Sequence, residues 1–136
     1  MKAKYMLDTN ICIYIIKNKP LGVKEKLSLI VPEDICLSSI TVSELFYGVE
    51  KSQYPQKNRE ALEDFLINFN IMDYGYEASE SYGKIRAHLE KTGDIIGAMD
   101  LMIAAHALSL KTILVTNNMK EFKKIEGLKI ENWYLY

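Results

Sequence analysis

The stretch KYMLDTNICIYIIKNK, residues 4–19, decides the fold that we predict for this chain. Residues 5–7 are typical of a short buried strand, and the apolar run that follows suits a buried helix. Between them stand an acid, a hydroxyl and an amide, Asp8, Thr9 and Asn10. Asn10 favours a helix start, whereas a lone carboxylate at the end of a buried strand costs free energy unless it is paired. We therefore expect Asp8 to have a function beyond folding.

The rest of the chain continues this alternation of short strands and helices. Strands are predicted over residues 2–7, 34–39, 71–72, 112–116 and 128–135. Helices are predicted over residues 10–17, 23–30, 41–51, 56–69, 76–91, 97–110 and 119–125. Such alternation is typical of an α/β sandwich around a mainly parallel central sheet. Because no repeat or linker divides the sequence, residues 1–136 are predicted to form one domain.

The composition excludes several classes of protein. With 49% apolar and 26% charged residues, the 136-residue chain is not disordered, and its net charge of −1 excludes a strongly basic nucleic-acid binder. Cys12 and Cys36 lie in apolar runs without metal-ligand spacing, which indicates buried thiols in a reducing compartment. There is no signal-peptide pattern, and no apolar run approaches the length of a membrane helix. We expect a cytoplasmic protein without membrane contact.

Polar side chains follow three of the predicted strands, at the point where each strand ends. These junctions are the segments Asp8–Asn10, Ser38–Glu44 and Thr116–Glu121. A further acid, Asp100, lies in the first turn of the apolar helix over 97–110. In a parallel sheet with right-handed crossovers the carboxyl ends of the strands share one edge, where such folds bind ligands. The acids of these segments are therefore predicted to share one crevice.

Helix capping offers an alternative explanation for most of these residues. Thr41–Glu44 and Asn118–Glu121 both have the spacing of a capping box. Asp100 in a first helical turn is favoured by the helix dipole. Asp8 fits this explanation worst, because it stands two residues before Asn10, the expected cap.

A bound cation explains the acids together. If Asp8, Glu44 and Asp100 share a crevice, their carboxylates must either take up protons or hold a cation. A ligand set made of oxygen atoms suits a hard ion such as Mg²⁺ or Mn²⁺. Such an ion supports hydrolysis of phosphodiester bonds.

Four motifs in this order resemble one known family. YMLDTNI, SSITVSELFYG, IGAMDLMIAAHA and ILVTNNMKEF together are similar to the PIN-domain ribonucleases, and most of all to the VapC toxins of bacterial toxin–antitoxin pairs. The resemblance runs nearly from end to end of the chain. It implies a three-layer α/β/α sandwich whose acidic cluster binds Mg²⁺ or Mn²⁺ at the carboxyl ends of the strands.

The resemblance also implies roles for four acids. Asp8 and Asp100 would be direct metal ligands, Glu44 would bind the metal directly or through water, and Glu121 would complete the acidic ring. All four would thus be catalytic residues.

Four polar residues would support these acids. By the same resemblance, Thr9 and Asn10 would orient Asp8, while Thr116 and Asn117 would line the pocket. The chain departs from the family at one point, since many PIN domains carry an aspartate directly after the last core strand, where this chain has Asn117 and Asn118. The fourth acid must then be supplied one helical turn later.

The resemblance implies three partners. The first is an RNA substrate, namely tRNA and in particular the anticodon region of the initiator tRNA. The second is a VapB-type antitoxin whose C-terminal segment covers the active site. The third is a second copy of the chain in a homodimer. Lysine clusters usually form a solvated face, but RNA phosphates could bind here to Lys17, Lys19, Lys120 and Arg86.

Three other functions compete with a nuclease. A phosphoacceptor regulatory domain needs an acidic pair after the first strand and an aspartate after a middle one, and a phosphatase of the Asp-x-Asp type needs a second acid where Asn10 stands. A catalytically silent binding module would be favoured by the loss of an acid.

His106 lies about 240° around its helix from Asp100, so it is predicted to be structural, as is His88.

Overall fold

A parallel five-stranded sheet forms the centre of the protein, in the order β3-β2-β1-β4-β5. The computed structural model describes residues 3–134. The strands are β1 (Tyr5–Leu7), β2 (Ile35–Ser38), β3 (Asn70–Met72), β4 (Ile113–Val115) and β5 (Ile130–Glu131). All five predicted strands are present, although each except β3 is shorter than predicted, and the predicted strand residues Lys2 and Leu135 lie outside the described part of the chain. The predicted α/β fold with a mainly parallel sheet is confirmed.

Helices connect the strands. They are α1 (Thr9–Lys17), α2 (Leu21–Ser28), α3 (Ser39–Glu50), α4 (Pro55–Leu66), α5 (Tyr76–Thr92), α6 (Ala98–Leu110) and α7 (Met119–Phe122), with a 3-10 turn at Pro32–Asp34. Most ends differ from the predicted ends by one to three residues, as helix ends commonly do. Within residues 3–134, no helix combines the length and the apolar character needed to cross a membrane.

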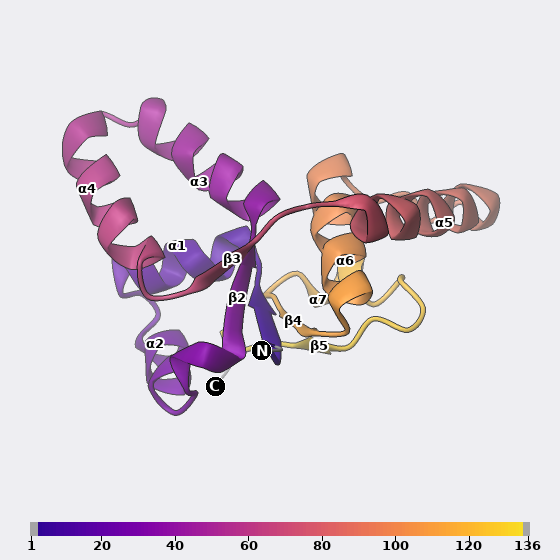
Figure 1. Ribbon diagram of the computed structural model, residues 1–136, viewed down its shortest axis with the longest axis horizontal. Helices are drawn as coiled ribbons and strands as arrows, with labels where there is room; N and C mark the ends of the chain where they lie inside the picture. Colours follow the sequence, from indigo (N-terminus) through magenta and orange to yellow (C-terminus); the bar gives the residue numbers. More distant parts are fainter. Residues whose placement is uncertain (1–2, 135–136) are drawn as a thin grey trace.

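The two faces of the sheet bury separate apolar clusters, which makes the three layers. Side chains alternate along a strand, so Tyr5 and Leu7 of β1 point into one cluster and Met6 points into the other. Helices α1 to α4 cover the first face, and α5 to α7 cover the second (Figure 1). Because the layers continue past the ends of the short strands, the carboxyl edge of the sheet lies between helices from both faces.

Helix α6 is buried on most sides, as its nearly uninterrupted apolar sequence predicts. Its buried residues include Ile103, Ala104 and His106. The last strand is followed by Trp133, which is buried and meets the ring of Tyr5 edge-on at 5.4 Å between centroids. The sheet therefore presents its ends, rather than its faces, to ligands.

Candidate active site

Asp8 stands at the end of β1, the middle strand of the sheet, and is only 4% exposed. Its backbone N–H donates to the carbonyl of Val115 in β4 at 3.0 Å, so the pairing of the sheet extends one residue past the strand. Its Oδ1 accepts a hydrogen bond from the N–H of Ile11 at 2.9 Å. Asp8 is therefore the N-cap of α1. The prediction that Asn10 caps this helix is wrong, since α1 begins at Thr9 and Asn10 is an exposed residue within its first turn.

Capping does not offset the cost of burying the Asp8 carboxylate. The pKa of Asp8 is raised from 3.8 to about 6, mainly by burial, with smaller contributions from the negative charges of Asp100 and Glu44. Hydrogen bonds from the Thr116 side chain and from the Ile11 N–H lower the pKa, but burial has the larger effect. Near neutral pH the protein thus holds a destabilised anion at this edge.

Glu44 comes from the second turn of α3 on one side of the crevice. It accepts a hydrogen bond from the hydroxyl of Thr9 at 2.5 Å. The sequence prediction placed Thr9 beside Asp8, but its hydroxyl instead orients Glu44. The predicted capping box is also wrong, because the N-cap of α3 is Ser38, whose Oγ accepts from the N–H of Ile40 at 3.1 Å. Thr41 is buried inside the helix, and its hydroxyl has no hydrogen-bond partner in the described chain.

Asp100 lies in the first turn of α6, on the other side of the crevice. Burial raises its pKa, and the negative charges of Glu44 and Glu121 add to the effect. Asp8, Glu44, Asp100 and Glu121 are therefore close enough to influence one another through their charges. The structure brings the four predicted acids to one edge of the sheet.

Two of the four carboxylates are oriented by contacts with other side chains. Glu44 is bonded to Thr9, and Glu121 Oε2 lies 3.3 Å from the ammonium of Lys124. With these orientations, no group of three or more His, Cys, Asp or Glu side chains within residues 3–134 stands close enough together to hold a metal ion.

The chemistry of the donor set nevertheless fits a hard divalent cation. The donors are carboxylate oxygens, which Mg²⁺ and Mn²⁺ prefer. Repulsion among them contributes to the raised pKa values of Asp8 and Asp100, and a cation would remove that repulsion. Asp8, Asp100 and Glu44 are the residues that could hold it if the side chains of this edge moved closer together.

The junction after β4 supplies a hydroxyl rather than an acid. The buried Thr116 hydrogen-bonds to Asp8 through its side chain, and its Oγ1 accepts from the N–H of Asn118 at 2.9 Å. Asn117 does not serve the acids as predicted: its amide donates to the hydroxyl of Tyr14 and accepts from Asn132, both at 3.3 Å. Asn118 precedes α7 without a capping bond from its side chain, so the second predicted capping box is wrong.

The histidine in α6 lies at the carboxyl end of β2, beside Ser38. His106 is 2% exposed, and its Nδ1 lies 2.7 Å from the Oγ of Ser38. Burial lowers its pKa, and its ring meets that of Tyr74 edge-on. These contacts within the core agree with the predicted structural role.

The four predicted RNA contacts lie in different surroundings. Lys17, Lys19 and Lys120 are exposed, at the end of α1, in the turn after it and in α7. Arg86 instead lies on the exposed face of α5, where it pairs with Glu90 at 3.1 Å and donates to Tyr82. The structure thus leaves the three lysines available for phosphate.

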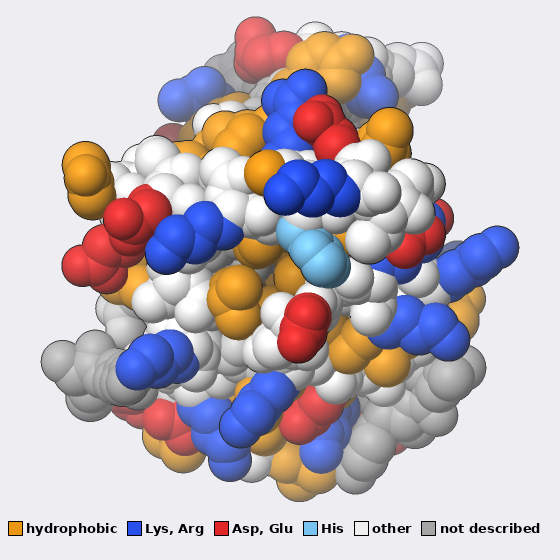
Figure 2. Space-filling view, turned by 90° about the vertical axis from the view of Figure 1, so that its right-hand side faces the viewer, with side chains coloured by type: hydrophobic (Ala, Val, Ile, Leu, Met, Phe, Trp, Pro, Cys, Tyr) orange, Lys and Arg blue, Asp and Glu red, His pale blue; other side chains and the backbone are white. Residues whose placement is uncertain are grey.

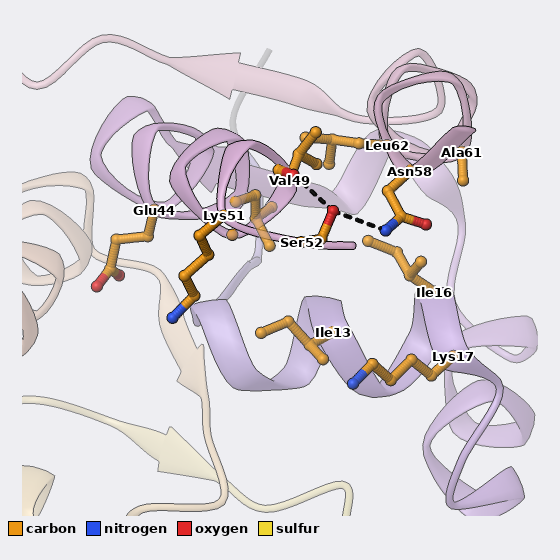
Figure 3. Close-up of a pocket in the computed structure, with 12 residues that line it drawn as sticks. Ile13, Ile16, Lys17, Glu44, Val49, Lys51, Ser52, Asn58, Ala61 and Leu62 are labelled. Atoms are coloured by element: carbon orange, nitrogen blue, oxygen red, sulfur yellow. Dashed lines mark hydrogen bonds between the residues drawn. The ribbon is translucent and has the colours of Figure 1, made fainter. Parts of the chain in front are cut away.

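A groove of about 390 Å³ opens beside the acids, between α1, α3 and α4 (Figure 3). Its walls are mostly apolar and include Ile13, Ile16 and Leu62. Charged side chains stand along it, with Glu44 at one end and Lys17 and Lys51 on its borders (Figure 3). Because Glu44 belongs to both the groove and the acidic edge, a molecule bound at that end of the groove would lie next to one of the acids.

The sequence reasoning missed three features of the site. The capping role of Asp8 could have been inferred from its position three residues before Ile11, where the first free N–H groups of a helix lie. The pairing of Lys124 with Glu121 follows the ordinary i, i+3 spacing of helical ion pairs. No sequence pattern indicates the contact between Asn117 and Tyr14, which are 103 residues apart.

Comparison with known proteins places this geometry in a family. The model of the PIN domain matches residues 5–128. A ribonuclease VapC2 of Haemophilus influenzae is 48% identical over 130 residues, covering 96% of this chain and 98% of the relative. A tRNA(fMet)-specific endonuclease VapC of Shigella flexneri is 47% identical over 130 residues, with the same coverage of both chains.

Solved structures give the same result. The DNA-bound VapBC of Salmonella typhimurium matches with a TM-score of 0.91 and 45% identity, covering 96% of this chain and 98% of that one. VapBC2 of Rickettsia felis, bound to a DNA fragment from its promoter, matches with a TM-score of 0.90 and 45% identity, covering 95% and 98%.

Proposed function

The chain belongs to the PIN-domain family, and from that premise we propose that it is an endoribonuclease toxin of the VapC type, neutralised by its own antitoxin. Its relatives of nearly equal length are named ribonucleases, and the similar structures are toxin–antitoxin complexes. We also propose that residues 1–136 form a single PIN domain.

The observation that supports this function best is the meeting of acids at the carboxyl edge of the sheet. Three acids that are far apart in the sequence affect one another's pKa through their charges. They are Asp8, directly after β1, Glu44 in α3 and Asp100 in α6. A binding module without catalysis would not need this destabilising arrangement. Phosphodiester hydrolysis does, because it needs a cation to neutralise charge that develops on phosphate oxygens.

The chain's own residues would hold the cation and orient its ligands. Asp8 and Asp100 would be the direct ligands, Glu44 would bind the ion directly or through water, and Glu121 would complete the acidic ring. Mg²⁺ or Mn²⁺ supplies charge neutralisation and activation of water when bound. The hydrogen bond from Thr116 lowers the pKa of Asp8 and so favours its ionised form, and the hydroxyl of Thr9 fixes Glu44.

The substrate we propose is tRNA, in particular the anticodon stem–loop of the initiator tRNA. Relatives from Shigella flexneri and Salmonella typhimurium carry the name tRNA(fMet)-specific endonuclease. A structured loop is recognised through its shape and a few phosphates, which suits a chain with a net charge of −1. Lys17, Lys19 and Lys120 are exposed lysines available for those phosphates.

The antitoxin, of the VapB type, occupies the groove between α1, α3 and α4. The apolar walls suit an amphipathic segment, and the position of Glu44 lets a basic residue of that segment reach the acids. The toxin acts as a homodimer in the cytoplasm, where its free thiols, Cys12 and Cys36, stay reduced.

The test compares the purified protein with Asp8→Asn and Asp100→Asn, acting on initiator tRNA with Mg²⁺ or Mn²⁺. Each change removes an anionic ligand, so we expect cleavage to fall by about 10³-fold, the equivalent of several kcal/mol of transition-state stabilisation. Asp94→Asn is the matched control, since Asp94 is an exposed loop residue close to Asp100 in sequence.

Two results would contradict the proposal. Equal cleavage by the wild type and both variants would exclude a metal-dependent nuclease at this site. Sequencing of the RNA ends should show one dominant cut in the anticodon loop, and scattered cuts would exclude the proposed tRNA specificity.

A further inference from the structure

A lysine stands against the acidic edge. The Nζ of Lys124 lies 3.3 Å from the Oε2 of Glu121, whose charge in turn contributes to the raised pKa of Asp100. The ion pairs Arg59–Glu63 and Arg86–Glu90, in contrast, lie on exposed faces of α4 and α5. Lys124 thus places a positive charge beside the carboxylates of the proposed active site.

The position of Lys124 is well defined by its surroundings. The side chains of Lys124 and Glu121 are 28% and 33% exposed, whereas those of the other two pairs are 52% to 58% exposed. The neighbours Phe122 and Ile125 are buried in the cluster beneath α5 and α6. Because both neighbours are anchored, the backbone that carries Lys124 has little freedom.

Lys124 also faces a second feature, a shallow hollow of about 210 Å³ between α5 and the segment after α7. Lys84 and His88, one helical turn apart on α5, line this hollow with Lys124, and Glu126 is its one acid. Figure 2 shows this side of the molecule, where an exposed histidine lies among both basic and acidic side chains. Lys124 therefore stands between the acidic edge and a surface with more basic than acidic groups.

Charge explains why a nuclease would need such a residue. Four carboxylates repel the phosphates of RNA, and one cation in the crevice does not neutralise them all. A lysine ammonium is a compact charge that binds phosphate as a point contact. If the RNA strand passed over Lys124 as it left the acidic edge, its phosphates would be attracted by the basic side chains of the hollow and no longer repelled by the carboxylates.

We propose that Lys124 binds a backbone phosphate of the substrate RNA next to the cleaved bond, where the strand passes from the acidic edge into the hollow lined by Lys84 and His88. Glu121 holds the ammonium in place until the phosphate arrives. This inference rests on the proposed ribonuclease function and specifies where the substrate lies.

A purely structural Lys124 would behave differently. If the ammonium only neutralises Glu121, its loss adds a negative charge to the edge. Mg²⁺ would then bind more tightly, and the salt dependence of RNA binding would stay the same. A lost phosphate contact instead lowers the number of counterions released when RNA binds.

The experiment measures binding of a fluorescein-labelled anticodon stem–loop of initiator tRNA by anisotropy, in EDTA, over a series of salt concentrations. For Lys124→Gln we expect about 5- to 10-fold weaker binding at low salt, and a slope of log K against log salt that is smaller by about 0.7 to 0.9. Lys84→Gln should lower the slope in the same way, and Lys124→Arg should keep it.

The control is Lys57→Gln, which removes an exposed lysine from α4 on the opposite face of the sheet and should leave the slope unchanged. An unchanged slope for Lys124→Gln, in a variant that melts at the wild-type temperature, would overturn the proposal. A wild type that binds the RNA but does not cleave it with Mg²⁺ or Mn²⁺ would instead refute the ribonuclease function, so the two failures are distinguishable.

Discussion

The junctions after β1 and β4 lie side by side at the same edge of the sheet, yet they do different work. Leu7 and Val115, the last residues of the two strands, are register partners, and each strand is followed by a polar tripeptide. After β1 the acid Asp8 is buried and caps α1. After β4 the hydroxyl of Thr116 serves Asp8, while Asn117 bonds to Tyr14 and Asn132. One junction thus supplies the anion, and the other supports that anion and fastens the C-terminal segment to α1.

This difference shows that neighbouring junctions of similar composition need not share a role. The aspartate that many PIN domains carry after the last core strand would add a further negative charge to this edge, at the cost of more repulsion. Here the fourth acid lies a turn later, in α7, where Lys124 compensates its charge. Three predictions test the comparison.

The largest effect expected is on stability and concerns Asp8→Asn. A folded-state pKa raised from 3.8 to about 6 means that the contribution of Asp8 to stability is fully present below pH 3.8 and is lost as the pH rises through 6. The neutral amide avoids this loss, so without metal the variant should be more stable at pH 8 by about 3 kcal/mol. Urea unfolding in EDTA between pH 4 and 8 measures the difference.

The gap between wild type and Asp8→Asn should be mostly closed near pH 4, because the folded carboxyl is then protonated and the unfolded one is close to its own pKa of 3.8. A gap of the same size at pH 4 and pH 8 would contradict a buried, destabilised anion. Mg²⁺ should stabilise the wild type and not the variant, since only the former has the ligand. Asp94→Asn, at an exposed loop position, should follow the wild type throughout.

A smaller effect is expected for Thr116→Val, which keeps the shape of the side chain and removes its hydrogen bond to Asp8. We expect kcat/KM for tRNA cleavage to fall about tenfold, as for other changes to the partners of metal ligands. In the wild type this hydrogen bond lowers the pKa of Asp8, so its loss should raise that pKa. The acidic limb of the pH–rate profile should therefore move to higher pH. Thr116→Ser should restore both quantities, and a profile that stays in place would show that the bond does not act on Asp8.

The smallest effect is expected for Asn117→Ala. The two lost hydrogen bonds, each 3.3 Å long, join the C-terminal segment to α1 and should cost about 1 kcal/mol of stability. Cleavage should stay within about twofold of the wild type, because Asn117 does not contact the acids. Thermal unfolding and kcat/KM measure the two effects, with Asn118→Ala as the neighbouring control. A loss of activity as large as that of Thr116→Val would mean that the two junction residues do the same work.

Much of the fold followed from local pattern. The run from Tyr5 to Leu7 and the apolar helix over Ala98–Leu110 were predicted because buried strands and helices differ in length and in spacing of apolar residues. The prediction that Asp8, Glu44 and Asp100 share an edge also needed only the rule that parallel strands end on the same side. By itself, the sequence determined the fold class and the meeting of these acids at the carboxyl edge of the sheet.

Only the tertiary structure decided what each polar group bonds to. Thr9 serves Glu44 across 35 residues, Asn117 meets Tyr14 across 103, and the cap of α1 is Asp8 rather than Asn10. Each of these hydrogen bonds forms only if two elements that are remote in the chain pack to within a few ångströms of each other, because a hydrogen bond weakens steeply as its donor and acceptor separate. Local pattern places a residue on an element, but packing between elements chooses its partner.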